Sequence, residues 1–247
     1  MKSLKLSVLA LVTVAALPAQ ANQFAVGAAV VVSPSPYAGD QDRVLPIPMV
    51  SYEGEHAYFK GLTGGVHVWQ NEQHRVSVNA YYLPLSFKPD DSDIYAMKRL
   101  DKRNATLMAG LLYRYTHPTL GVVRVDIGAD TLNNSNGVLG DIGYLYRFNF
   151  GQWGVTPGIG VTWASSNHNE YYYGVSGAES MRSGLAQYQP GSSWTPYIEL
   201  SVGYRINQNW SAFLAARGMA LPKEVKDSPM VDSSVSGTLI AGFNYAF

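Results

Sequence analysis

The sequence predicts an all-β outer-membrane protein that folds as a transmembrane antiparallel up-and-down β-barrel of about twelve strands. Three observations lead to this fold class: long segments in which apolar and polar residues alternate, connections that alternate between short and long, and an export segment at the N-terminus. Strands in soluble proteins commonly have about 5–6 residues, whereas a tilted strand needs about 9–11 residues to cross a bilayer. The clearest alternating segments, 138–150 and 194–206, are long enough to cross.

The composition excludes several other classes of protein. The 247 residues carry 18 basic and 18 acidic side chains and no cysteine. Without cysteine the chain is not a disulfide scaffold, a zinc ribbon or a thiol enzyme, and without a basic excess it does not look like a nucleic-acid binder. Only 15% of the residues are charged, against about 25% in ordinary soluble domains. A weakly charged chain that is rich in glycine and aromatic residues suits a membrane barrel.

Residues 1–21 have the features of a signal peptide. Lys2 and Lys5 precede an apolar run over 6–17, and Ala19-Gln20-Ala21 is a small-x-small cleavage site. A membrane anchor is the alternative, but the apolar run is shorter than the roughly 20 residues of a spanning helix. We therefore expect export, and a mature chain that consists of one barrel over 22–247.

The alternation in 194–206 separates one apolar face from one mostly polar face. Successive side chains of a strand point to opposite sides of a sheet. In a transmembrane barrel the apolar side contacts lipid and the polar side lines the interior. The apolar face of this segment consists of Trp194, Pro196, Ile198, Leu200, Val202, Tyr204 and Ile206.

Connection lengths allow the strands to be counted. Outer-membrane barrels have short periplasmic turns and longer outer loops, so both termini fall on the periplasmic side. Ten segments are clear, and 55–70 must then begin and end on the periplasmic side, which requires two more short strands. The alternative is a ten-stranded barrel with this hairpin inside it or at its edge. The strands expected in chain order are 23–33, 45–53, 56–61, 63–70, 74–87, 104–116, 121–131, 138–150, 153–165, 194–206, 209–221 and 235–247.

Aromatic residues support the same fold. The segment 235–247 has apolar residues at alternate positions and ends on Phe247, which is typical of the last strand of an outer-membrane barrel. Tyrosine and tryptophan lie mainly near the predicted strand ends, where amphipathic rings suit the headgroup level of a bilayer. Trp69, Trp153 and Trp210 are examples.

Ten charged residues fall on the predicted interior faces. Isolated buried charges are very costly, so these charges must be paired or hydrated. They form either a structural ion-pair network that fills the lumen or a constriction that selects charged solutes. The ten candidates are Arg75, Arg114, Arg124, Asp126, Asp130, Asp141, Arg147, Glu199, Arg205 and Arg217.

The longest connection, 166–193, is a second candidate region. Loops of this length are usually functional or ordered. The loop either folds into the barrel as a plug or lid, or presents a binding surface. Its candidate residues combine tyrosines, which supply rigid contact area, with charges: Glu170, Tyr171, Tyr172, Tyr173, Glu179 and Arg182.

No motif indicates catalysis, a metal or a cofactor. The run 174–178 lacks the final glycine of a nucleophile elbow and no α/β fold surrounds it. The five histidines are scattered without ligand spacing. The charged segment 90–103 is interpreted as a short helix in a solvated outer loop, or otherwise as a site for cations or lipopolysaccharide phosphate.

Several runs together resemble the MipA/OmpV family of outer-membrane proteins. NEYYYGVS and DSPMVD are the most specific of them, and Asn133 departs from the aspartate expected in the DNSNG motif. The matching stretches extend over the whole mature chain: 48–54, 97–110, 130–137, 155–161, 169–185 and 227–232.

The resemblance implies a non-enzymatic scaffold in the outer membrane, in contact with lipid and lipopolysaccharide. It implies that the protein brings together a murein lytic transglycosylase and a bifunctional penicillin-binding murein synthase, for enlargement of the peptidoglycan sacculus. The charged lumen keeps a small-solute channel as the alternative function. An outer-membrane enzyme acting on lipids is a third possibility, but no credible Ser-His pair supports it.

Overall fold

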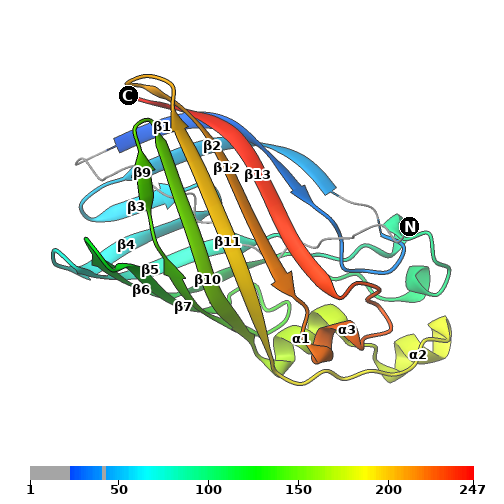
Figure 1. Ribbon diagram of the computed structural model, residues 1–247. Helices are drawn as coiled ribbons and strands as arrows, with labels where there is room; N and C mark the ends of the chain where they lie inside the picture. Colours follow the sequence, from blue (N-terminus) through cyan, green and yellow to red (C-terminus); the bar gives the residue numbers. More distant parts are fainter. Residues whose placement is uncertain (1–22, 41–42) are drawn as a thin grey trace.

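The computed structural model describes residues 23–40 and 43–247, so the predicted signal peptide lies outside the described residues. The strands form one sheet that closes on itself because β10 also pairs with β11 (Figure 1). The strands are β1 Gln23–Ser33, β2 Arg43–Glu53, β3 Ala57–Lys60, β4 Thr63–Gln70, β5 His74–Leu83, β6 Thr106–His117, β7 Gly121–Asp130, β8 Val138–Leu145, β9 Phe148–Phe150, β10 Trp153–Ala164, β11 Ser193–Arg205, β12 Trp210–Ala220 and β13 Val235–Ala246.

The barrel wall is twelve strands around, because β8 and β9 pair in succession with the same strand, β10, and occupy one position in the wall. The twelve-stranded prediction is confirmed and the ten-stranded alternative is wrong. The sequence predicts one unbroken strand over 138–150, but the structure interrupts it at residues 146 and 147. The Tyr146 N–H donates to the Pro157 carbonyl at 3.1 Å, while Pro157 has no N–H to complete the reciprocal bond. The ladder therefore opens at this pair.

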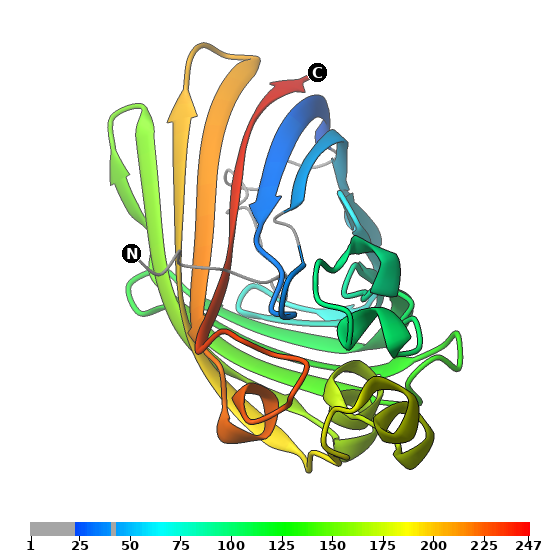
Figure 2. The ribbon, with the colours of Figure 1, turned by 90° about the vertical axis from the view of Figure 1, so that its right-hand side faces the viewer.

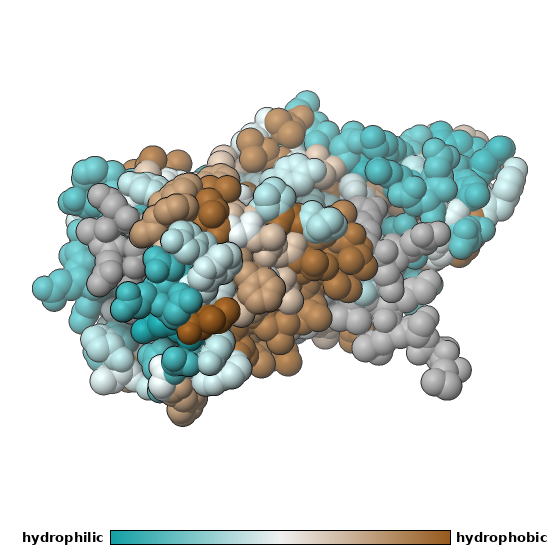
Figure 3. All heavy atoms as spheres, turned by 90° about the horizontal axis from the view of Figure 1, so that it is seen from above, coloured by the Kyte–Doolittle hydropathy of each residue, from teal (hydrophilic) through white to brown (hydrophobic). Residues whose placement is uncertain are grey.

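The two faces of the strands alternate as predicted. In β11, Ile198 is 68% exposed on the outside, whereas Tyr197 and Glu199 are buried on the inside. Seen from above, hydrophobic residues gather in the middle of the barrel between hydrophilic ends (Figure 3). This is the surface expected of a wall that crosses a bilayer. Within the described ranges, no helix has the length and hydropathy needed to span a membrane.

The long connections all lie at one end of the barrel, opposite the short turns (Figures 1 and 2). We call these the outer end and the inner end, following the usual orientation of outer-membrane barrels. At the inner end, the Phe247 N–H donates to the Phe24 carbonyl at 3.1 Å. β1 pairs with β13 along almost its whole length, and this seam closes the barrel.

The outer loops fold together into what we call the outer cap, formed by 34–40, 84–105, 131–137, 165–192 and 221–234. The cap contains the short helices η1 Pro89–Asp91, η2 Met97–Arg99, α1 Ser166–Tyr173, α2 Gly177–Ser183 and α3 Lys223–Lys226. It encloses a continuous apolar cluster that includes Tyr37, Phe87, Met97, Tyr172, Val175 and Met230. Loops distant in sequence thus share one core.

The β3–β4 hairpin is shorter than its neighbours. Only Ser51–Glu53 of β2 pairs with β3, and the hairpin that β3 forms with β4 turns at residues 61 and 62. The Gly61 N–H donates to the Val50 carbonyl at 3.0 Å, which is the last bond along this side of β2. Within the described residues, positions 43–49 of β2 therefore have a strand partner only in β1.

Candidate functional site

Four of the predicted interior charges meet in the middle of the lumen, and we call them the lumen network. Arg124 of β7 lies 3.1 Å from Asp141 of β8 and 3.8 Å from Glu199 of β11, measured between Nη2 and the nearest carboxylate oxygen. Arg217 of β12 lies 2.5 Å from the other oxygen of Glu199. The contacts run from Asp141 to Arg124, from Arg124 to Glu199 and from Glu199 to Arg217, so each charge has a partner of opposite sign.

Tyr197 lies at the centre of the lumen network. Its hydroxyl donates to Asp141 at 3.0 Å and accepts from Arg124 at 3.1 Å, and the Arg217 guanidinium stands 4.0 Å from the ring centroid. The ring fits because glycine faces it: a Cβ at Gly160 would lie 2.3 Å from the Tyr197 hydroxyl. The cross-strand register thus leaves the space that the tyrosine occupies.

Asp126 lies directly opposite Asp141 in the ladder between β7 and β8. Like charges in this position repel one another. Asn79 of β5 donates its amide to Asp126 at 2.6 Å, while Thr162 donates its hydroxyl to Asp141 at 2.9 Å. Neutral donors on both sides therefore help to accommodate this carboxylate pair.

The inner half of the lumen is rich in cations. Arg75, Arg114 and Arg124 are direct cross-strand neighbours on β5, β6 and β7. Glu53 accepts from Arg75 at 2.7 Å and lies 2.8 Å from Lys60. Arg114 is exposed to the lumen and has no carboxylate partner among the described residues.

Two further predicted charges lie nearer the inner end. Arg147 donates to Asn149 at 2.9 Å, and Arg205 is exposed at the end of β11. Together with Lys60, Arg75 and Arg114 they give the inner half of the lumen a positive character.

Asp130 does not join the lumen network, because it lies at the outer end of β7. Its carboxylate accepts from the backbone N–H groups of Leu132, Ser135 and Asn136, at 2.6–3.0 Å, and from the Thr106 hydroxyl. These bonds hold the turn 131–137, in which Asn136 adopts a positive φ of 52°. Asparagine tolerates this conformation better than most residues. Asp130 thus stays on the interior face of β7, opposite buried Met108, and there it orders the loop.

A buried ion pair joins two loops of the outer cap. Arg103 lies 2.7 Å from Glu179 of α2, and both side chains are buried. Glu179 also accepts from the Asp101 N–H at 3.0 Å and from the Ser176 N–H and hydroxyl at 2.9 Å, which completes a capping box. Burial alone would raise the pKa of Glu179, but these donors and the Arg103 charge together hold it below its ordinary value. The expectation of a solvated loop over 90–103 is therefore wrong for Arg103.

The tyrosines of α1 bind the cap together. Tyr172 is fully buried, donates to the Asn104 carbonyl at 3.0 Å, and accepts at its own carbonyl from Tyr37 at 3.1 Å. The Tyr171 hydroxyl accepts from the Asn104 N–H at 2.8 Å. The Tyr173 ring lies 6.0 Å from that of Tyr37. These contacts join α1 to two other outer loops.

The remaining loop candidates are closer to solvent. Glu170 accepts from Gln189 at 3.2 Å, and exposed Arg182 forms an ion pair with Asp101. Beneath α1, a small cavity is bounded by His168 and Asn169. Burial lowers the pKa of His168 to about 4, so this imidazole is neutral at physiological pH. In the part of the chain that the structure describes, no cluster of potential ligands could hold a metal ion.

Sequence reasoning missed several of the residues that organise these regions. Tyr197 and Asn79 lie on the interior faces of predicted strands, so the alternation held a signal for them, but only charges were selected. Glu53 is a charge at the end of the predicted strand 45–53 and was overlooked. Arg103 and Tyr37 carried no such signal, since their partners come from loops far away in the sequence.

Known proteins resemble the chain over its full length. It matches the family described as MltA-interacting protein MipA over residues 26–247. It is 45% identical over 247 residues to the MltA-interacting protein of Escherichia coli, which covers 100% of this chain and 99% of the relative. It is 38% identical over 229 residues to a putative outer membrane protein, YiaT, of the same organism, covering 93% of each.

Further similarities are more distant. Outer membrane protein OmpV of Vibrio cholerae is 26% identical over 211 residues, covering 84% of this chain and 80% of the relative. Among solved structures, an outer membrane channel of Pseudomonas putida aligns with a TM-score of 0.48 at 10% identity, covering 94% of this chain and 97% of the other. The closed barrel and the sequence relatives named as outer membrane proteins identify an outer-membrane protein, and the chain belongs to the MltA-interacting protein MipA family.

Proposed function

We propose that the protein is an outer-membrane scaffold that binds a murein lytic transglycosylase and brings it together with a bifunctional penicillin-binding murein synthase. The observation that carries this proposal is the 45% identity, over the whole chain, to a relative named for its interaction with MltA. Coupling of murein cleavage to murein synthesis would serve enlargement of the sacculus. The proposal assigns the chain no catalytic residue and no cofactor.

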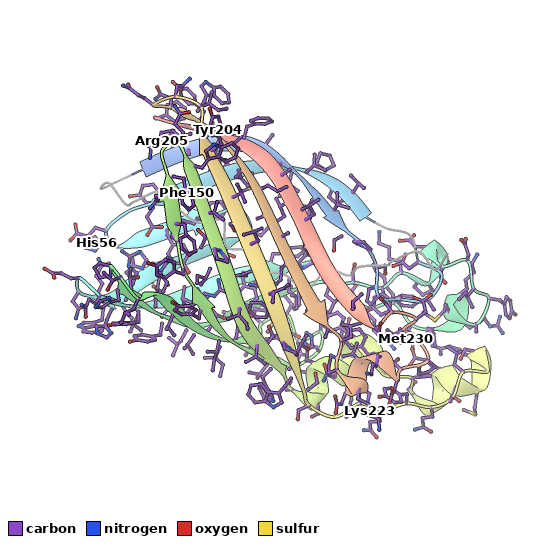
Figure 4. All side chains as sticks on the ribbon, in the orientation of Figure 1. His56, Phe150, Tyr204, Arg205, Lys223 and Met230 are labelled. Carbon is purple, nitrogen blue, oxygen red and sulfur yellow. The ribbon has the colours of Figure 1, made fainter. Side chains whose placement is uncertain are left out.

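We place the docking surface at the inner end of the barrel, because murein enzymes work in the periplasm. The turns there are short, and exposed apolar side chains lie in or next to them: Leu120, in the turn after β6, is 61% exposed, and Phe150, at the end of β9, is 62% exposed. His56, Phe150, Tyr204 and Arg205 lie at this end, whereas Lys223 and Met230 lie in the outer cap (Figure 4). Exposed apolar side chains on a polar rim are typical of protein interaction sites.

The test measures binding of the purified barrel to each enzyme separately by surface plasmon resonance, with an unrelated barrel as the control. We expect specific binding to both enzymes. Phe150→Ser should weaken that binding at least tenfold, as loss of an interface anchor does. Met181→Ser is the matched control, because Met181 is 85% exposed in the outer cap. Binding to neither enzyme would refute the scaffold, and equal loss in both variants would refute the inner-end surface.

The small-solute channel is the second candidate, and the cation-rich inner lumen is the observation that favours it. A positively charged pore attracts anions and raises their local concentration. Current across planar bilayers decides between the two functions. Steady conductance with anion preference supports the channel, whereas the absence of steady current removes it. The outer cap, which joins the long loops at one end, favours the second outcome.

A further inference from the structure

The short β3–β4 hairpin leaves a stretch of the barrel wall without strand pairing, which we call the window. β2 continues toward the outer end beyond the hairpin, while β5 is bonded to the hairpin turn through the Tyr82 N–H and the Leu62 carbonyl at 2.9 Å. The inner border of the window is the bond between Gly61 and Val50. Its two sides are residues 43–49 of β2 and the chain that continues β5 beyond Tyr82 toward the outer end.

The outer border of the window is closed by the cap. The Asp93 N–H donates to the Gly39 carbonyl at 2.9 Å, and the Ser92 hydroxyl donates to the Ala38 carbonyl at 3.0 Å. Just below, the ring centroid of Tyr37 lies 4.9 Å from that of Phe87. The loops that follow β1 and β5 therefore meet above the window, which is bounded on all sides.

The free edge of β2 is unsuited to binding another strand. Val50 directs its backbone carbonyl toward β3. Every second residue of a strand directs its N–H and carbonyl to the same side, so those of residues 44, 46 and 48 point to the open edge. Two of these residues, Pro46 and Pro48, have no N–H, so two of the donors that a partner strand would need are missing. Unpaired N–H groups in a bilayer are costly, whereas carbonyls that lack a full set of partners are more common. The prolines thus leave an open edge that suits lipid.

The surfaces around the window are apolar on both sides of the wall. Toward the membrane, Val44, Pro46 and Pro48 are exposed. Toward the lumen, β2 presents Leu45, Ile47 and Met49, in contrast to the charges on the strands opposite. Leu45 is 48% exposed although it faces inward.

The apolar lining continues onto the neighbouring strands. Ile47 pairs with Ala29 of β1, which in turn lies beside Phe213 around Gly242. Ala29 and Phe213 are both buried on the luminal side. The apolar lining on the luminal side of β2 therefore extends across β1 to β12.

We propose that this window is a lateral binding site for one acyl chain of a membrane lipid, which enters the lumen from the bilayer between β2 and β5. The edge lies in the lipid-facing wall, so acyl chains are what it meets. The prolines disfavour a protein strand, and the luminal side chains at positions 45, 47 and 49 of β2 are apolar, so they offer no charge that would hold a polar solute. This site is independent of the scaffold function, since it lies on the membrane side and not at the inner end.

The experiment measures how strongly lipid acyl chains quench a fluorophore attached at one position of the barrel. The chain has no cysteine, so a single introduced cysteine is labelled specifically. Single variants Leu45→Cys, Leu111→Cys and Leu112→Cys each carry an NBD fluorophore. Leu111 faces lipid at 52% exposure, and Leu112 faces the lumen from a strand paired on both edges. The variants are placed in phosphatidylcholine vesicles that contain doxyl-labelled phosphatidylcholine, whose acyl-chain nitroxide quenches nearby NBD. Heat-modifiable migration on gels checks that each barrel is folded.

We expect quenching at Leu45 within twofold of that at Leu111 and at least fivefold above that at Leu112. Quenching at Leu45 no greater than at Leu112 overturns the proposal. Ile47→Cys is the second luminal probe if Leu45→Cys does not fold. Adding Ile47→Phe to Leu45→Cys fills the luminal side of the window and should remove most of the quenching. Undiminished quenching in that double variant shows that the label swings outward, which also overturns the proposal.

Discussion

Removal of one partner from the buried pair in the outer cap should loosen the cap without unfolding the barrel. In Arg103→Met the Glu179 carboxylate stays buried and loses its cation. Breaking a buried pair in this way costs about 3–5 kcal/mol. Three donors to Glu179 remain, from Asp101 and Ser176, so we expect the lower end of that range, about 3 kcal/mol.

Hydrogen exchange measured by mass spectrometry gives the result for each segment separately. A loss of about 3 kcal/mol corresponds to roughly 100-fold faster opening of the affected unit. We expect this acceleration in α2 and no change in β11. Lys102→Met is the matched control, because it removes an exposed neighbouring cation. The reasoning is refuted if α2 exchanges at the normal rate, or if β11 accelerates by the same factor.

The remaining predictions use the same logic at other positions. Acid should also open the cap, because the pKa of Glu179 is lowered in the folded state. The stability that the Glu179 carboxylate contributes is present above its ordinary pKa of 4.5 and is lost as the pH falls through the folded value. Hydrogen exchange of α2 compared at pH 3 and pH 7 would show this loss. Gly160→Ala should destabilise the barrel by about 1–3 kcal/mol in urea titrations, because the new methyl group meets Tyr197, while Gly203→Ala, with open space around it, should have little effect. Arg217→Gln should cost about 3 kcal/mol or more by removing the nearer cation from Glu199. Arg114 has no carboxylate partner in the described ranges, so Arg114→Gln should stay within about 0.5 kcal/mol of the parent.

The barrel could be predicted because the features that define it lie within short stretches of the sequence. A strand that faces lipid on one side shows its two faces within a few residues, as 194–206 does, and the alternation of loop lengths supplies the parity that requires two strands over 55–70. The interruption near Tyr146 was not predicted. Its cause is Pro157 on the neighbouring strand, and the alternation within 138–150 does not reveal which residue lies opposite.

The sites were predictable only in part. The interior faces located the charges, but which cation meets which carboxylate depends on register across four strands, and Tyr197 organises the network without a charge of its own. The core of the outer cap could be predicted even less from the sequence. Its core combines Tyr37, Phe87 and Met230 from three different loops, and no periodicity within one loop reports such contacts.

The seam between β1 and β13 has a consequence for the order of assembly. These are the described strands furthest apart in the sequence, and each is the other's partner. Contacts between distant segments form slowly because a long loop must close first. During synthesis and export, β1 therefore has an exposed edge until β13 is available, and such an edge invites pairing with other chains. The protein depends on being kept apart from its own copies until the whole sheet can close.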